Sequence, residues 1–188
     1  MKTIPVTLCA ALVAAALPAS AQTVIPVPYF KSLELEGGGH VTLRYGKVQS
    51  VRLVKGSTQF TPFVMSESRK LRILACNEDC PRHYDLEVEV TTPDIDALAV
   101  SGGGHIEGDG NFPGQRQLAL AVDGGGTIDA RAMPSQEAIA AVEGGGKIFV
   151  DAERKLTAAI NGGGKIRYRG EPNLTQAIDG GGSVERGD

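Results

Sequence analysis

The residues with the most regular spacing for chemistry are polar side chains that each stand directly before a run of three glycines. Four are carboxylates, the ligand type that calcium and magnesium prefer: Glu36, Asp123, Glu143 and Asp179. If successive copies stack, these carboxylates repel one another unless a cation or a positive side chain intervenes. We predict solvated turn residues and no bound metal, and keep the four as candidate ligands. Lys147 and Lys165, just after their triplets, would partly neutralise Glu143.

The histidines and cysteines give two further hypotheses. His40 and His105 occupy the same slot after their triplets, but zinc needs three or four ligands, so solvated corner residues are expected. His83 lies near Cys76 and Cys80, and a fourth zinc ligand is not evident there. In an oxidising compartment these two cysteines, four apart in a turn-rich segment, are predicted to form a disulfide that staples a loop. A redox pair would show Cys-x-x-Cys opening a helix.

No motif predicts catalysis. A glycosidase needs two carboxylates that flank a cleft, whereas Asp151, Glu153 and Glu171 are scattered over turns. Ser101 lacks the Gly-x-Ser-x-Gly context of a hydrolase nucleophile. There is no phosphate loop, dinucleotide fingerprint or haem motif, so we predict no enzyme and no cofactor. A carbohydrate-active β-helix enzyme stays as the less favoured alternative, and turnover abolished by mutating Asp151 or Glu171 would favour it.

The elements that must position these residues are set by a repeat. Gly-Gly-Gly occurs six times, and each copy is framed by an aliphatic and a polar residue before it and by a polar residue and Val or Ile after it. The last five copies start at intervals of 18 to 22 residues. Three glycines in a row fit a corner that needs positive φ or close backbone approach. The predicted structural glycines are Gly37, Gly38, Gly39, Gly102, Gly103, Gly104, Gly124, Gly125, Gly126, Gly144, Gly145, Gly146, Gly162, Gly163, Gly164, Gly180, Gly181 and Gly182.

Apolar residues at every second position flank each triplet and predict strands with one face inward. A unit of this size cannot bury its apolar face alone, so neighbouring units must stack. We therefore predict an all-β fold, a short right-handed parallel β-helix or solenoid with an irregular N-terminal strand region. Residues 95–188 would form the regular coils and residues 22–94 the irregular part of one domain. The alternating segments between residues 48 and 92 are either irregular early coils or a strand layer that covers the end.

The first 21 residues predict export. Lys2, an apolar stretch over residues 4–17 and Ala19-Ser20-Ala21 form a signal peptide with cleavage between Ala21 and Gln22. A lipoprotein attached through Cys9 is the alternative. After cleavage no apolar run long enough to span a membrane remains, and the formal net charge of −3 becomes about −4 once Lys2 is removed. This mild acidity argues against nucleic-acid binding.

Several segments resemble a known family: residues 30–37, Tyr45-Gly46, Leu71-Arg72-Ile73, the link at residues 92–98 and the closing residues 163–172. These are similar to the putative auto-transporter adhesin family, head GIN domain, over nearly all of the mature chain. The resemblance implies the fold and an adhesin role. Members of that family commonly carry Ser-Gly-Ser-Gly at the corners, whereas this chain has Gly-Gly-Gly. A serine-lined surface shared by the family is therefore not expected in this chain.

The sequence thus predicts an exported, envelope-associated protein, periplasmic or secreted, that binds a glycan or an envelope protein. A self-associating structural element that stacks through its open ends or edges, and hence a homo-oligomer, is the alternative.

Overall fold

The computed structural model describes residues 22–76 and 80–187, which form one sheet of fifteen strands. Within these ranges no helix has the length and apolarity that a membrane crossing needs. The expected signal peptide and Cys9 lie outside the described residues. In chain order the strands are β1 Thr23–Ile25, β2 Ser32–Gly37, β3 His40–Tyr45, β4 Ser50–Lys55, β5 Phe63–Met65, β6 Lys70–Leu74, β7 Glu87–Thr92, β8 Ala97–Gly102, β9 His105–Asp109, β10 Gln115–Gly124, β11 Thr127–Gly144, β12 Lys147–Gly162, β13 Lys165–Arg169, β14 Asn173–Asp179 and β15 Ser183–Arg186.

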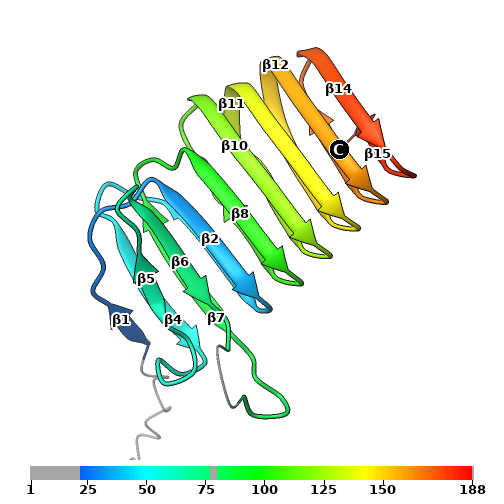
Figure 1. The fold of residues 1–188 in the computed structure, drawn as a ribbon. Coiled ribbons are helices and arrows are strands. Elements are labelled where there is room, and N and C mark those ends of the chain that lie inside the picture. Colours follow the sequence, from blue (N-terminus) through cyan, green and yellow to red (C-terminus); the bar gives the residue numbers. More distant parts are fainter. Residues whose placement is uncertain (1–21, 77–79, 188) are drawn as a thin grey trace, which may run out of the picture.

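The sheet folds into two walls around a single core (Figure 1). The first wall runs β5-β6-β2-β8-β10-β11-β12-β14, and the second runs β1-β4-β7-β3-β9-β11-β12-β13-β15. β11 and β12 belong to both walls because each pairs with different neighbours along its length. The glycine triplets lie where the chain leaves the first wall and enters the second.

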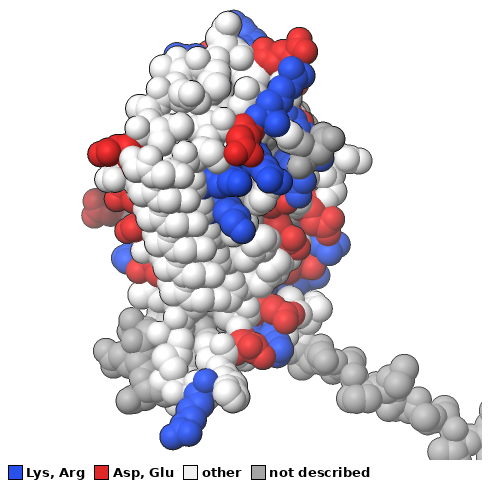
Figure 2. All heavy atoms as spheres, turned by 90° about the vertical axis from the view of Figure 1, so that its right-hand side faces the viewer, with Lys and Arg blue, Asp and Glu red and all other residues white. Residues whose placement is uncertain are grey.

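Equivalent glycines of successive triplets are register partners across the first wall, for example Gly102 with Gly124 and Gly124 with Gly144. The middle glycines of four triplets, Gly103, Gly125, Gly145 and Gly163, donate their N–H to the carbonyl of the first glycine of the preceding triplet, as in Gly145 to Gly124 at 2.9 Å. The first glycine has positive φ, 98° at Gly144, where a side chain is strained. Figure 2 shows this side of the molecule as a broad strip without charge, with charged side chains along both margins.

The core consists of aliphatic columns that cross the strands. In the first wall one column passes through Val100, Val122, Val142 and Ile160, all nearly fully buried. In the second wall a matching column passes through Val41, Ile106, Ile128, Ile148 and Ile166. Burial of branched aliphatic side chains in register supplies the main stabilisation, because each contributes on the order of 2 kcal/mol.

The expected short right-handed parallel β-helix is wrong as the fold class. The strands form one nearly closed mixed sheet, in which β1 with β4, β4 with β7 and β5 with β6 pair antiparallel. The physical reason lies in segments that lack triplets. Between β5 and β6 the chain reverses in a tight turn, where Arg69 donates its N–H to the Ser66 carbonyl at 3.1 Å and has a φ of 58°.

The strands within residues 48–92 all extend the two walls. β6 and β7 pair parallel with β2 and β3, so they extend the two walls by one unit. β4 and β1 continue the second wall beyond β7, and β5 continues the first wall beyond β6, in each case by antiparallel pairing.

Replacing the first and the middle glycine of one triplet tests the corner geometry. An added Cβ at Gly144 would stand 2.8 Å from the Gly124 carbonyl oxygen, whereas at Gly145 it would meet nothing within 4 Å. We expect Gly144→Ala to lower the free energy of unfolding by about 1–3 kcal/mol. Gly145→Ala should leave it unchanged or raise it by up to about 1 kcal/mol. Urea unfolding followed by circular dichroism measures both, and equal losses would contradict the corner model.

Candidate binding groove

A long groove follows the edge of the first wall where the chain enters it, opposite the glycine corners. Its floor is a row of outward side chains that are register partners on β10, β11, β12 and β14: Gln117, Glu137, Lys155 and Asn173. Because neighbouring strands lie about 4.8 Å apart, the row presents one polar group at each such step. Gln117, Glu137 and Lys155 face outward because each stands one position before a buried residue of its strand, and Asn173 is the register partner of Lys155.

The groove has two adjoining sections that share Glu137. The larger, of about 880 Å³, lies between the turn before β8 and the start of β10 and is lined by Lys31, Asp94, Asp96, Gln115, Arg116 and Gln117, among others. The smaller, of about 460 Å³, continues over β12 and β14. Both sections are predominantly polar, which suits a hydroxyl-rich or charged ligand more than an apolar one.

One end of the groove is fixed by a hydrogen-bonded network. Tyr29 donates its hydroxyl to the Asp94 carboxylate, and Lys31 Nζ lies 2.9 Å from Asp94 and 3.7 Å from Asp96. The hydrogen bond from Tyr29, together with Lys31, lowers the pKa of Asp94. The same contact with Asp94 raises the pKa of Lys31 and that of Tyr29. The network therefore holds a charged carboxylate and a charged ammonium at the groove wall at neutral pH.

Gln115 supplies an unsatisfied donor. Its Nε2 is buried and has no hydrogen-bond partner among the described residues. Buried polar groups without partners are rare in native proteins because each costs free energy. Gln115, Arg116 and Gln117 were not predicted from the sequence; the available signal was their position as a run of long polar side chains directly before the buried Leu118.

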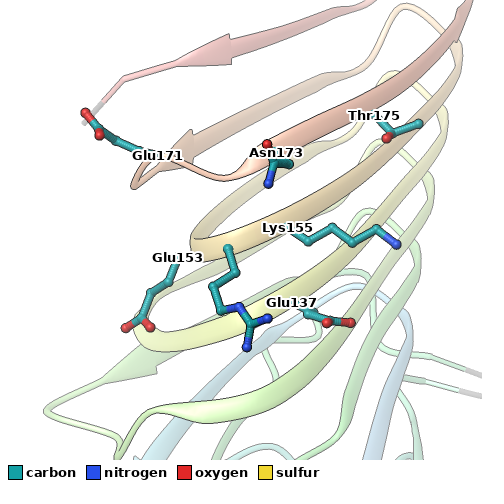
Figure 3. Close-up of a pocket in the computed structure, with 7 residues that line it drawn as sticks. Glu137, Glu153, Lys155, Glu171, Asn173 and Thr175 are labelled. Atoms are coloured by element: carbon teal, nitrogen blue, oxygen red, sulfur yellow. The ribbon is translucent and has the colours of Figure 1, made fainter.

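The carboxylates of the smaller section do not converge. Figure 3 shows Glu153 and Glu171 at one margin, directed away from Glu137 and Lys155, whose side chains extend to the opposite margin. Glu171 is exposed and pairs with Arg186 at 3.1 Å. Asp151 does not line this section; its carbonyl accepts the Ser135 hydroxyl at 3.2 Å.

The four candidate metal ligands lie in one outward row, but not side by side throughout. Asp123 and Glu143 are direct register partners, whereas Ser101 separates Glu36 from Asp123 and Asn161 separates Glu143 from Asp179. Glu36 pairs with Arg72 at 2.5 Å, which raises the pKa of Arg72. In the described part of the chain no three His, Cys, Asp or Glu side chains are grouped as a metal site would require. Lys165, one of the two lysines expected to neutralise Glu143 partly, lies 3.9 Å from the Glu185 carboxylate.

His40 and His105 stack with their ring centroids 4.9 Å apart. The Glu107 carboxylate contacts both rings, with Oε1 3.0 Å from His40 Nε2 and Oε2 3.6 Å from His105 Nε2. His83 is exposed and contacts the Arg82 carbonyl at 3.0 Å. Cys76 and Cys80 are joined by a disulfide with their Cα atoms 5.8 Å apart.

Comparison with known structures shows a shared fold. The crystal structure of a putative adhesin from Bacteroides fragilis is 13% identical, with 88% of this chain and 95% of that chain covered and a TM-score of 0.57. Putative adhesins from Parabacteroides merdae and Parabacteroides distasonis are 15% and 17% identical, cover 89% and 88% of this chain and 96% of theirs, and have TM-scores of 0.44 and 0.42. No curated protein matches the chain.

A family model described as "Putative auto-transporter adhesin, head GIN domain" matches residues 115–172, which include most of the groove floor. Of the segments that carried the resemblance in the sequence, residues 163–172 lie inside this match. The resemblance is therefore confirmed, and over residues 115–172 this chain matches the head GIN domain of the putative auto-transporter adhesins.

Proposed function

We propose that the protein is an exported, adhesin-like binding protein of the cell envelope and that its long groove holds an extended glycan. The observation that carries the proposal is the polar lining of the two adjoining groove sections, where Gln115, Arg116 and Lys155 supply donors and Asp94 and Asp96 supply acceptors. The adhesin part rests on the family match to residues 115–172 and on the likeness to the Bacteroides fragilis protein described as a putative adhesin.

The donors and acceptors of the groove suit sugar hydroxyls. A hydroxyl both donates and accepts, so it can join an amide N–H or guanidinium on one side to a carboxylate on the other. Asp94 and Asp96 supply acceptors, while Gln115, Arg116 and Lys155 supply donors. The step between strands is comparable to the length of one sugar ring, which lets successive residues of an extended glycan meet equivalent groups. A rigid sheet also lowers the ordering cost of binding.

The same groove supports binding without turnover. Hydrolysis of a glycosidic bond needs two carboxylates placed across the bond, one as acid and one as base or nucleophile. Glu153 and Glu171 point away from Glu137 rather than toward a common point (Figure 3). We expect no release of reducing sugar from any glycan that binds, and turnover lost in Asp151→Asn or Glu171→Gln would contradict a non-enzymatic role.

A glycan array followed by calorimetry with Gln115→Leu and Arg116→Ala tests the groove. Arg116→Ala should weaken binding by about tenfold or more, because it removes a charged hydrogen-bond donor. Gln115→Leu should also weaken binding, yet leave the ligand-free protein as stable or up to about 1 kcal/mol more stable, because an unsatisfied donor is removed. Arg167→Ala, on the second wall, is the matched control. Equal affinity in the wild type and both groove variants would exclude this groove.

The pH dependence of binding follows from Asp94. Its pKa is lowered, so the carboxylate stays charged from about pH 8 down to about pH 5 and is protonated only at pH values below its ordinary pKa of about 3.9. Affinity that depends on Asp94 should stay constant over the first interval and fall below about pH 4. Calorimetry at several pH values checks this, with Asp94→Asn as a control that should lack the acid decline. A decline already complete at pH 5 would contradict the assignment.

A further inference from the structure

The two ends of the sheet differ within the described residues. At one end the edge strands are β1 and β5, which have three residues each and pair on one side only, with β4 and β6. At the other end β14 pairs only with β12 and β15 only with β13, so their outer edges have no strand partner there (Figure 1). Along such an edge every second residue directs its N–H and C=O away from the sheet. This is a ready template for another strand.

The aliphatic columns of the first wall continue into this edge and become exposed there. Leu156 is fully buried and Ile160 is 3% exposed, while their register partners in β14, Leu174 and Ile178, are 37% and 40% exposed. Gln176 stands between them, in the column that holds Ala158 and Ala140 in the preceding units. The last unit thus presents two core-type side chains to solvent, with a polar amide at the centre.

The sequence of β14 is complementary to itself when two copies run antiparallel. With Gln176 at the centre, Leu174 of each copy stands opposite Ile178 of the other, and the two Gln176 amides face each other. Opposite residues in antiparallel strands point to the same face, so all of these side chains face the core. A centre at Ala177 would instead set Gln176 opposite Ile178. If the two-fold axis passed between two residues, side chains that face the core in one copy would stand opposite side chains that face outward in the other.

Charge also favours this register. Asn173 stands opposite Asp179 of the other copy, an amide that donates to a carboxylate, and Thr175 stands opposite Ala177. No two like charges oppose each other within β14. The opposite end offers a poorer match, because its edge strands β1 and β5 have only three residues each. Association of identical edges closes after two copies, whereas head-to-tail contacts would build an open filament.

We propose that two copies of this chain form a closed dimer about a two-fold axis at Gln176, with β14 of each copy adding antiparallel to β14 of the other. The aliphatic columns of the two copies then become continuous across the axis, and Leu174 and Ile178 are buried. Such pairing of exposed edges is a recognised mode of strand addition. The dimer does not depend on the glycan groove, so a failure of either proposal leaves the other standing.

Site-specific crosslinking tests the register. Gln176→Cys places the two thiols opposite each other on the axis, whereas Thr175→Cys points out of the core and faces Ala177. Cys76 and Cys80 are already paired. With a short thiol-to-thiol crosslinker we expect a dimer on a non-reducing gel for Gln176→Cys and at most about a tenth of that yield for the Thr175→Cys control. Equal yields from both, or none from either, would overturn the register.

Sedimentation equilibrium tests the dimer itself. The wild type should reach the mass of two chains and no more as its concentration rises. Gln176→Lys should raise the dissociation constant about a hundredfold, because two ammonium groups would face each other in the interface. Asn173→Lys, which faces Asp179 of the other copy, should leave the dimer as tight or tighter. A monomeric wild type, a mass that grows without limit, or equal weakening by both lysines would overturn the proposal.

Discussion

The structure depends on the close approach of backbones at the glycine corners. The first glycine of each triplet holds a left-handed φ, and the carbonyl of its counterpart in the neighbouring unit fills the place where a Cβ would stand, 2.8 Å away at Gly144 and 2.9 Å away at Gly124. The middle glycine donates to that same carbonyl, at 2.9 Å from Gly163 to Gly144. This contact fixes the register of one unit on the next. Once the register is fixed, the side-chain period of two determines which residues enter the core.

The groove and the open edge both follow from this register. Identical offsets align Gln117, Glu137, Lys155 and Asn173 in one row, so a polar surface one residue wide becomes a continuous floor. The same alignment carries the aliphatic columns to β14, where the last unit has no covering strand among the described residues. The opposite end differs because residues without triplets form antiparallel strands there.

The repeat, its strands and the inward aliphatic positions could be predicted from the sequence, because the side-chain period of two and the residues that frame each triplet are local patterns. The sequence was insufficient for the fold class. Whether a strand pairs parallel or antiparallel depends on turns such as that at Ser66–Arg69, which lack a distinctive motif. The groove was missed for a related reason: Lys31, Asp94 and Gln115 are far apart in sequence and are ordinary polar residues until the sheet brings them together. The regular spacing of the acidic residues before the triplets made them candidate metal ligands, yet Glu36 is already paired with Arg72.

Amide hydrogen exchange measured by NMR at the middle glycines tests the corner constraint most directly. These glycines are exposed at the molecular edge, so an unbonded amide there would exchange at the rate of a solvated loop. The account predicts that the amides of Gly103, Gly125, Gly145 and Gly163 are protected to the same degree as those of the flanking strands, because each donates to the neighbouring unit. Loop-like exchange at these four amides, with protected strands on either side, would contradict it.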